Sequence, residues 1–187
     1  MMVLIYAKTR SSGILAVVTM RARYRIRAAV NLANGSTLAG LGVALAGQAR
    51  LSRAPDGLIT ATGCRLPVPP APAFTLGNVI LTRRNLIPHD SALFRHEARH
   101  ATQYAWCGGV LMLPMYFAAA GASWVVCGNF GAWNLFERNA GLTDGGYPAW
   151  PPRPVISRVA ERSLTRARSA RARLALRAAT EGPQSIP

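Results

Sequence analysis

Two histidines four residues apart, with a glutamate beside the first, are the part of this sequence best suited to chemistry. The segment reads His96-Glu97-Ala98-Arg99-His100. In a helix, residues four apart lie one above the other on a single face, so both imidazoles can reach one ion. The HExxH pattern on a helix is typical of a zinc site with a glutamate base. We therefore predict that His96 and His100 bind Zn²⁺ and that Glu97 activates a zinc-bound water.

A catalytic zinc site takes three protein ligands, so the motif requires a third. The chain has seven acidic residues, and no charged residue stands between His100 and Glu137. Because Glu137 lies in the apolar, helix-like stretch 133–140, its carboxylate should be bound or paired there. We predict Glu137 as the third ligand. An ion pair between Glu137 and an arginine is one alternative, and Asp144, more typical of a turn, is the reserve ligand.

Polar side chains near the motif are candidates for orienting the ligands or stabilising an oxyanion. Gln103 stands three residues after His100, and Tyr147 follows Glu137 by ten. We predict Gln103 and Tyr147 in these supporting roles, with an ordinary core or surface position as the alternative for each. The weaker candidates are Tyr104, Tyr116, Asn78, Asn134 and His89.

The motif needs a helix to carry it. Ser91, after Pro88 and Asp90, favours a helix start, and the glycines at 108–109 favour a stop. These signals predict a helix over 92–106.

Other segments surround this helix. Upstream, 57–81 alternates β-branched residues with Gly and Pro and predicts two or three short strands. Before them, 31–47 predicts a helix with Ser36 as N-cap and with glycines that permit close packing. Downstream we expect a short helix over 132–140 and a turn at 144–146.

The motif resembles the gluzincin branch of the zincin metallopeptidases. The sequence is more similar to small uncharacterised bacterial proteins that carry a Phe-Thr-x-Gly-Asn-Val-Ile strand, then HExxH, then Gln. Here these features are 74–80, 96–100 and Gln103, and the resemblance covers about residues 57–147. It implies zinc, peptidase activity on a protein or peptide substrate, and an α+β, mostly α fold. In that fold a small sheet or hairpin precedes the HExxH helix of a compact zincin-like core. The sequence has neither the third histidine of metzincins nor the NExxE motif of the best-known gluzincins.

The chain is strongly basic, with a net charge of +15. This charge favours an anionic partner, and a solvated basic surface is the alternative. Residues 155–179 predict an Arg-rich, weakly amphipathic helix that could lie on an anionic membrane surface. This tail has no aromatic residue for base stacking, so specific nucleic-acid recognition is not expected.

The apolar segment 105–128 raises the question of a membrane. Its centre, 110–127, approaches the length of a bilayer span but is interrupted by Pro114 and Gly121. A span without a return would separate His100 from Glu137 by about 30 Å. We therefore predict a buried helix, with membrane insertion as the alternative. The expected location is cytoplasmic or peripheral at the inner face of the membrane, and three widely spaced cysteines fit a reducing compartment.

These observations divide the chain into three parts. Residues 1–28 form a basic arm that starts at Met1 or at Met20, 29–150 form a zincin-like metal-binding domain, and 151–187 form a proline linker and Arg-rich tail. The predicted function is a zinc-dependent hydrolase, foremost a peptidase. The alternatives are a non-catalytic metal-binding or interaction module, associated with a membrane through 105–128 and the tail, and a basic membrane protein whose HExxH is accidental.

Overall fold

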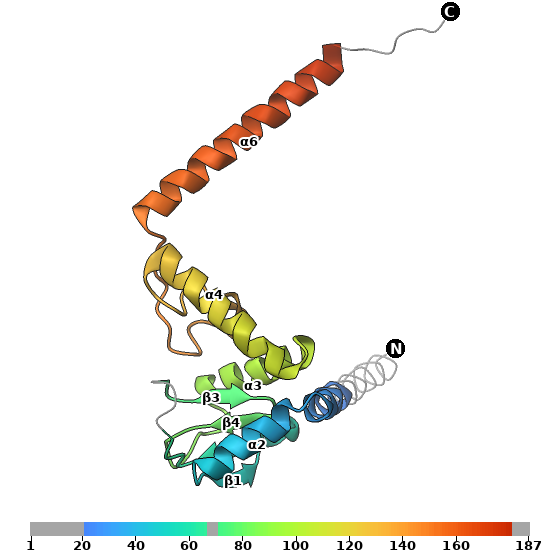
Figure 1. Ribbon diagram of the computed structural model, residues 1–187, viewed down its shortest axis with the longest axis vertical. Coiled ribbons are helices and arrows are strands. Elements are labelled where there is room, and N and C mark those ends of the chain that lie inside the picture. The colour runs from blue at the N-terminus through green and yellow to red at the C-terminus, as the bar shows by residue number, and fades with distance from the viewer. Residues whose placement is uncertain (1–20, 67–70, 181–187) are drawn as a thin grey trace, which may run out of the picture.

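The computed structural model describes residues 21–66 and 71–180 of the chain (Figure 1). The elements are a helical segment Arg21–Ala33, then α2 Ser36–Ala46, β1 Arg50–Arg53, η1 Pro55–Gly57, β2 Ile59–Thr62, β3 Phe74–Leu76, β4 Val79–Leu81, α3 Ala92–Trp106, η2 Gly109–Leu111, α4 Met112–Cys127, α5 Leu135–Ala140 and α6 Pro154–Thr180. The predicted α+β, mostly helical fold is confirmed. Most of the predicted basic arm and three prolines of the cluster at 67–72 lie outside the described residues.

The four strands form one mixed sheet in the order β1-β2-β4-β3. β2 and β4 pair in parallel, and both outer pairs are antiparallel. β1 was not predicted from the sequence, because all four of its residues are exposed and it has no alternating apolar face.

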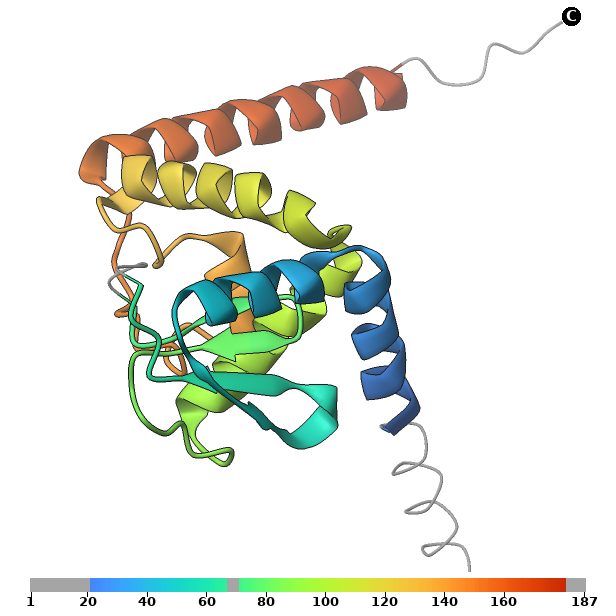
Figure 2. The ribbon, with the colours of Figure 1, turned by 60° about the horizontal axis from the view of Figure 1, so that its bottom comes forward.

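The central strand β4 separates two apolar clusters. Val79 and Leu81 pack with Ala44 of α2, whereas Ile80 packs with Phe94 of α3. Successive side chains of a strand point to opposite faces, so α2 and α3 cover the two faces of the sheet (Figure 2). α3, which carries the HExxH motif, is therefore held by the sheet's apolar core.

The start of α3 agrees with the sequence prediction. Ser91 is its N-cap, and the Ser91 Oγ accepts a hydrogen bond from the Phe94 N–H at 3.1 Å. The prediction of Ser36 as the N-cap of α2 is wrong, since Gly35 occupies that position with a φ of 79°. The chain bends there by 73° between the preceding helix and α2, and glycine adopts the left-handed conformation without a steric cost.

α4 differs from its sequence prediction in two ways. Pro114 does not interrupt it, because Pro114 lies in the first turn, where its missing N–H has no helical partner to lose. The apolar stretch Gly109–Cys127 is also more exposed than a core helix, with 22% of it buried. It is long and apolar enough to cross a membrane, a property that core helices of soluble proteins also have.

Candidate metal centre

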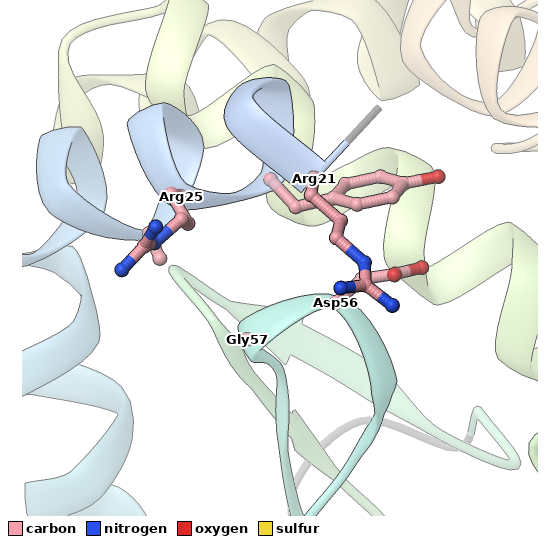
Figure 3. Close-up of a pocket in the computed structure, with 6 residues that line it drawn as sticks. Arg21, Arg25, Asp56 and Gly57 are labelled. Atoms are coloured by element: carbon pink, nitrogen blue, oxygen red, sulfur yellow. The ribbon is translucent and has the colours of Figure 1, made fainter. Parts of the chain in front are cut away.

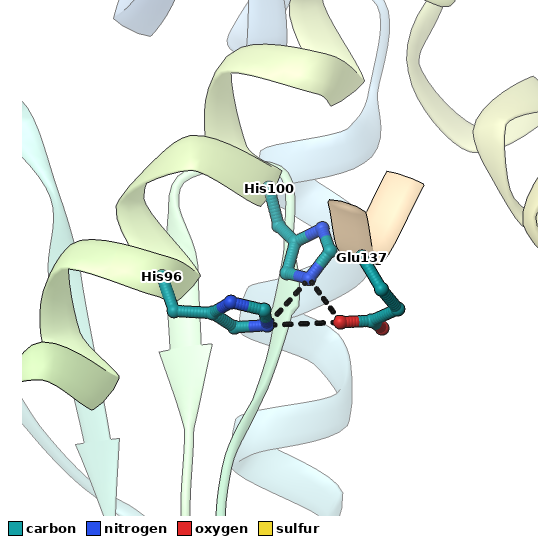
Figure 4. A group of neighbouring side chains, drawn as sticks. All are labelled: His96, His100 and Glu137. Carbon is teal, nitrogen blue, oxygen red and sulfur yellow. Dashed lines mark hydrogen bonds and ion pairs between the residues drawn. The ribbon is translucent and has the colours of Figure 1, made fainter. Parts of the chain in front are cut away.

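Three predicted ligand residues come together in a buried cluster (Figure 4). His96 and His100 project from one face of α3, and Glu137 faces them from α5. The Nε2 atoms of His96 and His100 are 3.0 Å apart. Glu137 Oε2 lies 3.0 Å from His96 Nε2 and 3.6 Å from His100 Nε2. His96 is 2% exposed, His100 is 7% exposed and Glu137 is 2% exposed. This arrangement could hold a metal ion.

The short helix α5 is anchored at both ends so that Glu137 faces α3. The Asn134 Oδ1 accepts the Phe136 N–H at 3.0 Å as the N-cap, and Gly141 ends the helix. From α3, the Gln103 side-chain amide donates to the Phe136 carbonyl at 2.9 Å. These contacts place Glu137 opposite the histidines although it lies 37 positions after His100 in the sequence.

Each imidazole is oriented by an oxygen on its far side. The His96 Nδ1 lies 3.0 Å from the Gly141 carbonyl oxygen, and the His100 Nδ1 lies 2.8 Å from Gln103 Oε1. Gln103 donates through its nitrogen to α5, which assigns its oxygen to His100. Because carbonyl oxygens only accept, we assign the proton of each neutral imidazole to Nδ1. The Nε2 lone pairs then point into the cluster, as in metal-ligating histidines.

The third atom in the cluster is an acceptor as well. Glu137 Oε2 is buried, and with the proton of each imidazole on Nδ1 it has no hydrogen-bond donor. Two imidazole lone pairs and a carboxylate oxygen at these distances repel one another unless a proton or a cation lies between them. In a tetrahedral zinc site with bonds of about 2.0–2.1 Å, neighbouring ligand atoms are about 3.3 Å apart. The observed distances of 3.0 to 3.6 Å therefore fit a metal ion of this size.

Glu137 is ionised in this environment. Its burial would raise its pKa, but its interactions with His100, His96 and the Tyr116 hydroxyl lower the pKa to about 2. Tyr116 of α4 donates to the other carboxylate oxygen, Oε1. Burial would likewise lower the pKa of His96, yet its interaction with Glu137 raises that pKa above the usual value. The Glu137 carboxylate therefore attracts a positive charge into the cluster, either a proton on His96 or a bound cation.

Glu97 lies beside the cluster but does not belong to it. Its side chain is 3% exposed, and its Oε2 accepts a hydrogen bond from the Thr75 hydroxyl of β3 at 2.7 Å. Burial raises the pKa of Glu97, while His100 and Thr75 lower it by less. A carboxyl group with a raised pKa close to a metal site suits proton transfer near neutral pH.

The loop after α5 covers the site. Gly145 lies against the His96 ring, because a Cβ on Gly145 would be 2.4 Å from His96 Cε1. Tyr147 has its ring centroid 6.2 Å from that of His96, and its pKa is raised to about 12 by burial and by the charge of Glu137. The predicted supporting residue Tyr147 is thus beside the cluster.

The reserve ligand Asp144 is engaged elsewhere. Its Oδ2 pairs with Arg99 at 2.7 Å, and the same Arg99 nitrogen donates to the Ala140 carbonyl at 2.6 Å. Arg99 therefore attaches the covering loop to α3. Nothing in the sequence indicated this role, because arginine is abundant throughout the chain.

The weaker candidates have other contacts. Tyr104 belongs to the apolar core, and Tyr116 contacts Glu137. Asn78 bonds to Asn31 and Thr37. Asn134 caps α5, and the exposed His89 packs against Phe94. The contact of Thr75 with Glu97 was missed, since a threonine in a strand gives no signal of its own.

A cavity of about 430 Å³ lies away from the metal cluster (Figure 3). It is lined by Arg21, Tyr24, Arg25, Ala28, Asp56 and Gly57. None of these residues belongs to the cluster or contacts Glu97. The cavity therefore does not provide a substrate pocket for the metal centre.

Comparison of the chain with protein-family models, curated proteins and solved structures gave no significant match.

Proposed function

We propose that the protein is a zinc-dependent hydrolase, foremost a peptidase. The observation that supports this proposal is the convergence of one ligand atom each from His96, His100 and Glu137, all within 4.8 Å of one another in a buried cluster with Glu97 beside it. Without a metal ion, the buried Glu137 carboxylate needs a proton on a histidine such as His96 as its partner, whereas a metal ion binds all three atoms at once.

Each residue has a distinct role in the proposed reaction. Zinc, when bound, acidifies a coordinated water and polarises the carbonyl under attack. Glu97 accepts the proton from the attacking water and returns it to the leaving amine. Gln103 and Gly141 keep the imidazoles in the tautomer that presents Nε2.

The donor set favours zinc, although it does not specify zinc alone. Two imidazoles and one carboxylate also bind iron(II) in oxygen-dependent enzymes. That chemistry does not call for a carboxylate next to the first histidine, whereas hydrolysis does. The position of Glu97 therefore supports the zinc hydrolase over an iron centre.

A second candidate is a metal-binding module without turnover. The specific observation in its favour is that the covering loop packs against the ligands, with Gly145 on the His96 ring. Structural zinc sites are closed, whereas catalytic sites keep a position open to substrate. Under this alternative the metal stabilises the contact between α3, α5 and the loop.

The test is the metal content of the purified full-length protein, measured by elemental analysis with and without reconstitution. We expect close to one zinc per chain, lost in His100→Ala and strongly reduced in Glu137→Gln, which preserves side-chain size. His89→Ala is the matched control, because His89 is exposed and outside the cluster, and it should keep its zinc.

Two outcomes would contradict the proposal. A folded wild-type protein that takes up no metal after reconstitution excludes the site. Stoichiometric iron in place of zinc would replace the hydrolase with the oxygen-dependent alternative.

A further inference from the structure

One face of α4 is apolar and exposed. The exposed positions of the helix are all nonpolar: Pro114, Met115, Phe117, Ala118, Gly121, Ala122, Trp124 and Val125. They recur at helical spacing and occupy one side, while Met112, Ala120, Ser123 and Cys127 face the protein. Phe117 is 67% and Val125 is 55% exposed. A helix that is apolar all round is normally covered by protein or by lipid, yet the stretch Gly109–Cys127 that includes α4 is 22% buried.

Aromatic and arginine side chains gather at the C-terminal end of this face. Trp124 stacks on Phe130, with ring centroids 6.4 Å apart, and the Arg153 guanidinium lies over Trp124 at 5.2 Å. Arg138 likewise lies over Trp133. Tryptophan beside arginine is the combination found where a protein meets the headgroup region of a membrane.

The positive charge of the chain continues directly from this end. The Arg153 N–H donates to the Val126 carbonyl of α4, and α6 begins at the next residue. α6 extends away from the sheet (Figure 1) and carries one acidic residue, Glu161. Among the side chains of α6 that the structure describes, the exposed arginines are Arg158, Arg162, Arg166, Arg168 and Arg171.

We propose that the exposed face of α4 and the arginines of α6 bind the surface of an anionic lipid bilayer. The apolar face enters the boundary between headgroups and acyl chains, and the arginines of α6 contact the phosphates of the lipids. An apolar surface alone could be covered by another protein. The adjoining cationic helix favours a partner that is apolar and anionic together, which describes such a membrane.

The contacts of α4 indicate that it lies in the plane of the membrane and does not cross it. Tyr116 is bonded to Glu137, and the Ser123 hydroxyl accepts the Trp133 N–H at 2.8 Å. Both ends of the helix are thus packed on the same domain, with its polar loops. A crossing helix would carry those loops into the hydrocarbon, where their backbone groups lose water.

The experiment is flotation of the full-length protein with vesicles of phosphatidylcholine, with and without phosphatidylglycerol. We expect the protein to bind the anionic vesicles, and this binding should fall as the salt concentration rises. Binding to the neutral vesicles should be weaker by about tenfold or more. Phe117→Glu with Val125→Glu should reduce binding about tenfold or more, because charge is placed in the apolar contact. Leu86→Glu is the matched control: Leu86 is 70% exposed, lies outside α4 and α6, and should leave binding unchanged.

A measurement on the wild-type protein tests the same proposal without any variant. Lipids brominated on their acyl chains should quench its tryptophan fluorescence, since Trp124 is 46% exposed on the proposed face. The proposal is overturned by the absence of flotation, by flotation without quenching, or by binding that the double variant retains while folded by circular dichroism. A soluble dimer that the double variant dissociates would assign the face to a second copy, and salt-sensitive binding to DNA without vesicle binding would assign α6 to nucleic acid.

Discussion

The His100 Nδ1 and Gln103 Oε1 face each other at 2.8 Å across one turn of α3. Gln103 also donates to the Phe136 carbonyl at 2.9 Å and to Asn139 Oδ1 at 3.0 Å. One side chain therefore sets the tautomer of a ligand and joins the helix of the histidines to the helix of Glu137.

Gln103→Ala should weaken metal binding about 10- to 100-fold, the usual effect of losing the partner that orients a histidine ligand. The affinity can be measured by competition with a chromophoric zinc chelator. Thr102→Ala is the control, because the Thr102 hydroxyl bonds to the Ala98 carbonyl within the same helix and not to the cluster. Equal affinities for the two variants would contradict the orienting role of Gln103.

Glu97→Gln should keep the metal and remove hydrolysis. An amide fills the same space and can accept the Thr75 hydrogen bond, but it cannot take a proton from water. Turnover of a fluorescent protein substrate should fall at least about 100-fold while the zinc content stays constant. Glu161→Gln makes the same chemical change in α6 and should preserve activity. If the Glu97 variant keeps its turnover, another group is the base.

The fold offers a paired test within α2. A Cβ on Gly40 would lie 2.4 Å from the Leu76 carbonyl oxygen, whereas a Cβ on Gly42 would meet nothing within 4 Å. Gly40→Ala should lower the free energy of unfolding by about 1–3 kcal/mol, since the helix must move off the sheet. Gly42→Ala should raise it by about 0.5–1 kcal/mol, because alanine restricts the unfolded chain. Urea denaturation followed by circular dichroism measures both, and equal effects would contradict the close contact.

Local signals predicted the parts of the fold that depend on neighbouring residues. Ser91 and the glycines after Trp106 marked α3, since capping is decided within a few residues. The same reasoning failed at Ser36, which was predicted as the N-cap of α2. The bend between two helices requires a left-handed backbone at the N-cap, and Gly35 adopts it. The exposed strand β1 gave no pattern, as its pairing with β2 uses backbone groups.

In the candidate site, too, the residues related by local spacing were predicted and several of those that depend on tertiary contacts were not. His96 and His100 share a helix face, so their spacing alone predicted that both could reach one ion. Glu137 was inferred from a scarcity of acids and from the cost of burying a carboxylate, and the structure places it in the cluster. Three further residues depend on tertiary contacts that no local pattern encodes. Thr75 bonds to Glu97, Tyr116 bonds to Glu137, and Arg99 holds the Ala140 carbonyl of α5.

Asp144 and Arg99 provide the last prediction, which separates the two acidic candidates for the third ligand. Asp144 bonds to Arg99 at 2.7 Å, so Asp144→Ala should leave close to one zinc per chain, unlike Glu137→Gln. Arg99→Ala should be more harmful, because Arg99 also holds the Ala140 carbonyl, next to the Gly141 carbonyl that orients His96. We expect about a tenfold loss of affinity in Arg99→Ala and a smaller one in Asp144→Ala. Cobalt substitution reports the geometry of the site through its visible spectrum, which should change in Arg99→Ala alone. A loss of zinc in Asp144→Ala that matches Glu137→Gln would instead make Asp144 a ligand.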